Sequence, residues 1–256
     1  MNKILVKKNK IEKNISDILI DSNEITIEKD INLDLEYYQT TDIIINFNIK
    51  ENVTVNLFVF SSQNDIKVNN TYNLENNAKL NIIKFYNNQK TIEQETINLN
   101  GLASQINYFN LNISQNKDVY NININHHNQK TISNINNKIV SLDQSIVKIN
   151  INSNLPKNKE NCILNQDSRI ILLGENKSSI NPNMYINNNE VSAKHASVIG
   201  PLQKQALFYL MTRGISYKDS VKLLIKGFLL SNLEINMDKR EKILKIINTY
   251  WRWIYE

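Results

Sequence analysis

Short runs of alternating apolar and polar residues dominate the chain from about Glu24 to Val191. Residues 45–49 read Ile-Asn-Phe-Asn-Ile, and residues 147–151 read Val-Lys-Ile-Asn-Ile. A period of two places every second side chain on the same face of a strand. Branched and aromatic residues would then face a core, while Asn, Lys and Thr face outward. The pattern predicts a mainly β structure over this region.

The apolar positions recur at a loose interval. Val55 to Leu80 is 25 residues, Leu80 to Ile106 is 26, and Ile122 to Val147 is again 25, whereas Ile106 to Ile122 is only 16. Coils of this length with few glycines favour a parallel β-solenoid. On pattern alone, an antiparallel β-sandwich with Asn-rich turns stays open as the alternative.

The period changes after Gly200. The spacing predicts a helix over 203–213 that is stopped by Gly214 just beyond its C-cap. A second helix is expected over 216–233, with a serine as its N-cap, and a third from about 238 to the end of the chain. We therefore expect a small helical domain to follow the strands.

Charge and asparagine content divide the chain at the same place. Residues 201–256 hold ten Lys and Arg against five Asp and Glu, which accounts for the whole net charge of +5. Of 46 asparagines, 43 precede Glu190. Asn suits left-handed turn positions and stacked side-chain ladders, although an AT-rich genome would also enrich it. We predict a β domain over 1–199 and a helical domain over 200–256.

Several function classes find no support in the composition. The chain has no apolar run near the length of a membrane-spanning helix and no signal-peptide pattern at its N-terminus. A single cysteine, Cys162, precludes an internal disulfide and suits a reducing cytosol. The five glycines stand singly, so no phosphate-binding loop is present, and no serine lies in a nucleophile elbow. We expect any ATP hydrolysis to belong to a partner.

One segment carries the sharpest functional signal. Residues 195–200 read His-Ala-Ser-Val-Ile-Gly, and Phe208-Tyr209 and Arg213-Gly-Ile follow at set distances. This series resembles the C-terminal signature of the SufB/SufD family of iron–sulfur cluster assembly scaffold proteins. We interpret the segment around His195 as a small-residue loop that leads into the first helix.

The resemblance extends from about residue 126 to residue 228. Weaker matches occur in the same order as in the family, at His127, Gln166, Pro182 and the pair Gly227-Phe228. The family has a right-handed parallel β-helix as its core, so the resemblance implies this fold, followed by the small C-terminal α-helical domain.

The chain also departs from the family pattern. Family members usually carry a helical domain before the β-helix, whereas this sequence is expected to start almost directly with strands. Ser168 stands where a SufB-type scaffold carries a cysteine, and Ala193 and Lys194 stand where SufD-type proteins often carry one. The chain therefore looks SufD-like and reduced, which puts its own capacity to hold a cluster in doubt.

The resemblance implies specific partners and residue roles. His195 would be a metal ligand at the interface with a SufB-like scaffold or with a second copy of the chain. The helical domain would dock a SufC-type ABC ATPase through Phe208, Tyr209, Arg213, Gly214, Gly227 and Phe228. We expect a cytoplasmic, non-catalytic subunit that contacts neither nucleic acid nor membrane. No cofactor would be bound stably, and iron or an iron–sulfur cluster would pass transiently at the partner interface.

Plainer interpretations stay open for each feature. His195 would serve equally as a helix cap or packing residue. His126 and His127 would lie on opposite faces of a strand, so they would not form a two-His metal site. Cys162 would be a small buried apolar residue. The lysines and arginines after residue 200 would form a solvated face rather than a nucleic-acid surface, with Trp251 and Trp253 among the apolar residues. The competing functions are a carbohydrate-active β-helix enzyme and a structural solenoid.

Overall fold

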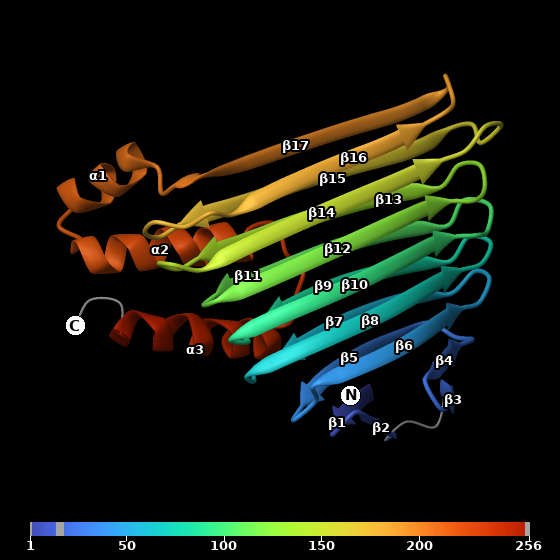
Figure 1. Ribbon diagram of the computed structural model, residues 1–256, viewed down its shortest axis with the longest axis horizontal. Helices are drawn as coiled ribbons and strands as arrows, with labels where there is room; N and C mark the ends of the chain where they lie inside the picture. Colours follow the sequence, from blue (N-terminus) through green and yellow to red (C-terminus); the bar gives the residue numbers. More distant parts are fainter. Residues whose placement is uncertain (1, 14–17, 254–256) are drawn as a thin grey trace.

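The chain forms a parallel β-solenoid followed by three helices (Figure 1). The computed structural model describes residues 2–13 and 18–253. From β5 onward successive strands alternate between two sheets, and every pair between neighbouring coils is parallel; antiparallel pairing joins only β1 to β2 and β3 to β4 among the described strands. Sheet A consists of β1 (Asn2–Lys7), β2 (Lys10–Lys13), β5 (Ile31–Tyr38), β7 (Thr54–Ser61), β9 (Lys79–Tyr86), β11 (Gln105–Ser114), β13 (Ile132–Ser141), β15 (Cys162–Leu172) and β17 (Val191–Pro201). Sheet B consists of β3 (Ile18–Asp21), β4 (Glu24–Ile27), β6 (Asp42–Ile49), β8 (Asp65–Leu74), β10 (Lys90–Leu99), β12 (Lys117–His126), β14 (Ile146–Leu155) and β16 (Ser179–Ile186).

The solenoid predicted from the sequence is confirmed, and the sandwich alternative is excluded by the parallel pairing. The step of 16 residues is not an irregular coil, because Ile106 lies in sheet A whereas Ile122 lies in sheet B. The true coil length is read along the outward asparagines of sheet A, which hydrogen-bond at separations of 24, 25, 26, 27 and 31 residues. The coils therefore lengthen toward the C-terminal end.

Asparagine occupies both kinds of position expected from the sequence, side-chain ladders and left-handed turns. Asn56, Asn81 and Asn107 lie in one ladder on sheet A, in which each Nδ2 donates to the Oδ1 of the preceding coil at 2.8–2.9 Å. Asn52 and Asn77 occupy left-handed turn positions with φ of 60° and 55°. The turn N–H groups then donate to carbonyls of the next coil, as Asn52 N does to Asn76 O at 2.9 Å. Such turns stack because their backbone bonds run between coils.

Two apolar cores hold the molecule together. One fills the lumen between the sheets, with fully buried residues such as Ile45, Leu80 and Ile151. The other lies between the outer face of sheet A and the helices, where Phe60 and Phe85 meet Val221 and Ile243. Sheet A is buried on both faces there, which explains the unbroken apolar run at the end of β7.

The three helices begin close to their predicted starts: α1 spans Lys204–Thr212, α2 Tyr217–Leu230 and α3 Met237–Trp253. Ser216 caps α2 by accepting from Asp219 N at 3.1 Å. Gly214 adopts φ +83° beyond the end of α1, as expected of a glycine stop. The second helix ends at Leu230, earlier than predicted, because Ser231 is extended and Asn232 has φ +59°. The side chains of Trp251 and Trp253 lie outside the described residues.

Helices α2 and α3 pack on sheet A, while α1 continues from β17 at the end of the last coil (Figure 1). The buried positions of α2, among them Val221, Ile225 and Leu229, recur at helical spacing. Full burial of such a side chain contributes about 1.5–3 kcal/mol. Lys218 and Lys222 lie off this stripe, so the basic residues of α2 lie beside an apolar packing face.

Candidate functional site

The C-terminal end of the solenoid is open. Among the described strands, β17 pairs with β15 on one side and with no strand on the other. Its side chains are exposed along nearly its whole length, including Val198 at 56% and Ile199 at 40%. A solenoid coil buries its inward residues only if another coil follows, and an uncovered edge strand keeps unpaired backbone groups. The last coil is therefore a ready pairing surface.

His195 lies within β17, so the prediction that it sits in a loop was wrong. The alternating pattern across 191–201 was obscured by small residues, and the strand is recognisable only by its register with β15. His195 is opposite Gln166, whose side chain is buried. Residues opposite each other on parallel strands share a face. His195 thus lies on the lumenal face of the open end, and its side chain is exposed.

A row of polar residues leads from this open end into the lumen. Strand register aligns Lys84, Asn110, Asn137, Ser168 and Ser197 on successive strands of sheet A. The first four are buried, and Asn137 Nδ2 donates to Ser168 Oγ at 2.9 Å. This row was not visible in the sequence, because its members are 26 to 31 residues apart and become neighbours only through the coil register.

His126 and Cys162 come together at a corner of the solenoid. His126 Nδ1 lies 2.7 Å from Thr131 Oγ1, and its Nε2 lies 3.0 Å from Ser133 Oγ. Thr131 Oγ1 also lies 3.2 Å from Cys162 Sγ. Burial, with the nearby His127 adding to it, lowers the pKa of His126 to about 4. Both ring nitrogens are engaged, so His126 is a neutral structural residue, and His127 is exposed beyond the strand.

Within the described part of the chain, no group of three or more His, Cys, Asp or Glu is placed to hold a metal ion. His195 is therefore a single imidazole at an exposed edge. Imidazole is a suitable iron ligand, but a complete site would need further donors from whatever covers the last coil.

Helix α1 presents an exposed apolar surface. All of its residues are described, and none is buried. Phe208 is 69% exposed and Tyr209 57%. The Arg213 guanidinium lies 5.3 Å from the centroid of the Tyr209 ring, and Gly214 follows at the helix end. We refer to Phe208, Tyr209, Arg213 and Gly214 as the α1 platform. Exposed aromatic patches of this kind mark interaction surfaces.

The other two predicted partner-binding residues lie on α2. Gly227 is exposed, and an added Cβ would meet no atom within 4 Å. Phe228 is only partly buried and packs against the core between sheet A and the helices. The structure therefore places two of the six predicted partner-binding residues on α1 and two just beyond its C-terminal end, whereas Phe228 contributes to packing inside the chain.

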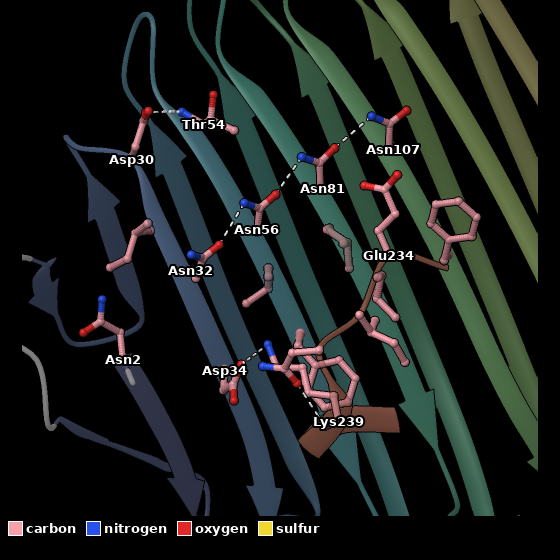
Figure 2. Close-up of a pocket in the computed structure, with 18 of the residues that line it drawn as sticks. Asn2, Asp30, Asn32, Asp34, Thr54, Asn56, Asn81, Asn107, Glu234 and Lys239 are labelled. Atoms are coloured by element: carbon pink, nitrogen blue, oxygen red, sulfur yellow. Dashed lines mark hydrogen bonds and ion pairs between the residues drawn. The ribbon is translucent and has the colours of Figure 1, made fainter. Parts of the chain in front are cut away.

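A groove of about 1070 Å³ runs along the outer face of sheet A, under the segment that leads into α3 (Figure 2). Its floor carries the asparagine ladder and two phenylalanines, and Asp30, Asp34 and Glu234 line it. The Lys239 ammonium lies 2.6 Å from Asp34 Oδ1 and closes one end. This groove could not be predicted from the sequence, because it exists only where the chain folds back from α2 over the early coils.

None of the described helices combines the length and apolarity needed to cross a membrane.

The comparisons with known proteins agree with this geometry. A family model described as SUF system FeS cluster assembly, SufBD core domain, matches residues 18–228. A stretch of 65 residues is 38% identical to the iron–sulfur cluster assembly protein SufD of Bacillus subtilis (strain 168), covering 25% of this chain and 15% of the relative. A stretch of 60 residues is 32% identical to an iron–sulfur cluster assembly SufBD family protein of Staphylococcus aureus (strain USA300), covering 23% of this chain and 13% of the relative. The matched stretches thus span less than a sixth of either relative.

The family match includes the open coil, the α1 platform and most of α2. It favours iron–sulfur cluster assembly over the carbohydrate-active and structural alternatives. Because the matched region extends over most of the sequence, the chain belongs to the SufBD core family of the SUF system for iron–sulfur cluster assembly.

Proposed function

We propose that this protein is a SufD-like, non-catalytic subunit of a cytoplasmic SUF assembly complex. It pairs through its open last coil with a SufB-like scaffold or a second copy of itself, and it docks a SufC-type ABC ATPase through the α1 platform. The single observation that carries the proposal is the exposure of both surfaces on consecutive elements, β17 and α1, inside the matched family region.

The open coil supports pairing because it combines an unpaired strand edge with exposed apolar residues. Val198 and Ile199 on β17 and Tyr185 on β16 are 56%, 40% and 60% exposed. Addition of one strand to β17 and one to β16, the edges of the two sheets, would satisfy backbone groups and cover these side chains. His195 would then face the partner across the junction, and iron or a cluster would be cargo held jointly there.

The α1 platform supports docking of a motor subunit. Only Leu202 and Gln203 separate the last strand from α1, so a displacement of α1 acts directly on β17. Helices α2 and α3 are anchored on sheet A. ATP-driven association of two partner ATPases would pull on α1, open the coil junction and expose His195 to iron.

Docking is tested by co-expressing the full chain with a SufC-type ATPase and measuring co-purification. Phe208→Ala with Tyr209→Ala is expected to reduce capture at least tenfold, because truncation of two aromatic anchors costs more than about 2 kcal/mol. Lys245→Ala on exposed α3 surface is the matched control. Full capture by the double variant would refute docking through this platform.

The role of His195 is tested in the complex with a SufB-like protein, purified without oxygen. His195→Ala is expected to lower bound iron and acid-labile sulfide while leaving the complex assembled. His127→Ala, which changes the other exposed histidine, controls for loss of an imidazole elsewhere. Unchanged iron and sulfide in His195→Ala would exclude the interfacial-ligand role.

A further inference from the structure

Three ionisable side chains meet inside the lumen, away from both proposed surfaces. Lys84 on β9 and Glu93 and Glu95 on β10 have fully buried side chains. Lys84 Nζ lies 3.0 Å from Glu93 Oε1 and also contacts Glu95 Oε1. Around them stand the buried tyrosines Tyr37 of β5, Tyr72 of β8, Tyr86 of β9, Tyr108 of β11 and Tyr120 of β12, and beyond Tyr120 lies Asp118.

The charges of this cluster do not balance if both carboxyl groups are ionised. Burial raises the pKa of each of these tyrosines well above its ordinary value, so the phenols are neutral. One ammonium would then face two carboxylates in a part of the lumen where all three side chains are fully buried. A buried charge without a partner is costly enough that the group takes up a proton instead.

The hydrogen bonds identify which carboxyl group is neutral. Glu93 accepts from Lys84, from the Tyr86 hydroxyl at 2.7 Å and from the Tyr108 hydroxyl at 3.5 Å, so both of its oxygens are supplied with donors. Glu95 Oε1 accepts from Lys84 and from Asn70 Nδ2, the latter at 3.0 Å. Glu95 Oε2 and Asn70 Oδ1 are both buried without a hydrogen-bond partner.

We propose that Glu95 is a proton-binding site inside the solenoid, with the proton on Oε2 donated to Asn70 Oδ1. One proton then satisfies both unpartnered oxygens and completes a two-bond pair between a carboxylic acid and an amide. Lys84 and Glu93 remain as the buried ion pair. The close contact from Lys84 to Glu95 fits this assignment, because the carbonyl oxygen of a neutral carboxyl group still accepts from an ammonium.

The energetics of burial point the same way. Burial, reinforced by the neighbouring Glu93 and opposed by Lys84, raises the pKa of Glu95 from 4.5 to about 8. The folded state therefore binds a proton that the unfolded state releases between these values. The stability it contributes is fully present below about 4.5 and is lost as the pH rises through about 8.

Two other buried groups with shifted pKa values, Asp118 and His126, titrate at lower pH. Burial raises the pKa of Asp118 from 3.8 to about 6. The protonation of His126 differs between the folded and unfolded states only between about pH 4 and pH 6.5. Between about 6.5 and 8, Glu95 dominates the dependence of stability on pH.

The test is urea unfolding of the full chain at several pH values in this window. The wild-type unfolding equilibrium constant is expected to rise nearly tenfold per pH unit at its steepest. Glu95→Gln keeps an N–H donor for Asn70 Oδ1 through its side-chain amide, so the variant is expected to fold stably. Its free energy of unfolding should not change with pH across this window. Glu93→Gln, the matched change two residues away, is expected to destabilise at every pH, because it removes the counter-ion of Lys84.

Infrared difference spectroscopy on the folded protein provides a second readout that does not require Glu93→Gln to fold. The C=O stretch of a protonated carboxyl group is expected in the wild type at neutral pH and absent in Glu95→Gln. Asn70→Ala should shift this band, because it removes the acceptor of the acid proton. A wild type without the band, or an equal pH slope in Glu95→Gln, would overturn the proposal.

The site begins the polar row that ends at Ser197 in the open coil. This inference does not depend on the proposed partners.

Discussion

At the scale of single residues, the solenoid turns decide which positions tolerate change. Most turn positions accept ordinary residues in the left-handed conformation, as Ala103 and Lys130 show with φ of 55° and 57°. Gly101 is different because of space rather than φ. A Cβ added there would lie 2.0 Å from Asn76 N and from Glu75 C, both main-chain atoms of the preceding coil.

Gly101→Ala is therefore expected to destabilise the protein by about 2–4 kcal/mol, because rigid backbone must shift to relieve the overlap. Chemical denaturation measures this loss. Gly227→Ala on α2 is the matched control, since its Cβ would meet open space. That change should stabilise by about 0.5–1 kcal/mol through helix propensity. Equal free energies of unfolding for Gly101→Ala and Gly227→Ala would contradict the close approach of Gly101 to the backbone of the preceding coil.

At the scale of elements, the helices are held on sheet A by apolar packing and by charged groups at the start of α3. Lys239 pairs with Asp34 of β5, with both side chains only 15% exposed, and its ammonium lies 4.9 Å from the Phe58 ring centroid (Figure 2). Lys242 lies one turn further along and reaches Glu36 at 3.0 Å and the Phe60 ring. These contacts hold the N-terminal part of α3 against β5 and β7.

Lys239→Met, which keeps the apolar stem and removes the charge, is expected to cost about 1–2 kcal/mol. The loss combines a partly buried ion pair with a cation–π contact. Thermal unfolding at low and high salt measures it, and salt should narrow the difference between wild type and variant. Lys245→Met on the exposed face of α3 should stay within about 0.5 kcal/mol of wild type. If salt leaves the stability difference between wild type and Lys239→Met unchanged, the loss comes from packing and not from charge.

At the scale of the whole molecule, stability should fall toward the open end. Central strands such as β11 have a paired neighbour on each side and a filled lumen. The last strand, β17, has one neighbour and exposed side chains on both faces. Local opening is cheapest where few contacts must break.

In the isolated chain, amide hydrogen exchange is therefore expected to be faster in β17 (Val191–Pro201) than in the other later strands of sheet A. It should be slowest at Gln105–Ser114. Binding of a partner at the open coil should slow exchange in β17 and leave β11 unchanged. Protection of β17 in the monomer equal to that of β11 would mean that the last coil is not a free edge.

Much of this organisation followed from local patterns. Alternation at period two predicted the strands, and helical spacing with Gly214 and Ser216 predicted where α1 ends and where α2 begins. These signals are local because one residue's neighbours along the chain are also its neighbours on the strand or helix. His195 was harder, because small residues on an exposed edge strand show no hydrophobic alternation.

The candidate site was predicted in part. The residues of the α1 platform lie close together along the chain, on α1 and at its C-terminal end, so their proximity was visible in the sequence. The lumenal row and the groove were not, since their members come from different coils.

By itself, the sequence determined the repeating strands, the three helices and the family signature, because each depends on residues close together along the chain. The tertiary structure alone decided the coil register, and with it the polar row, the buried cluster of Lys84, Glu93 and Glu95, and the lumenal position of His195. The physical reason is that register sets contacts between residues about one coil apart, and it results from the summed packing of all coils rather than from any one segment.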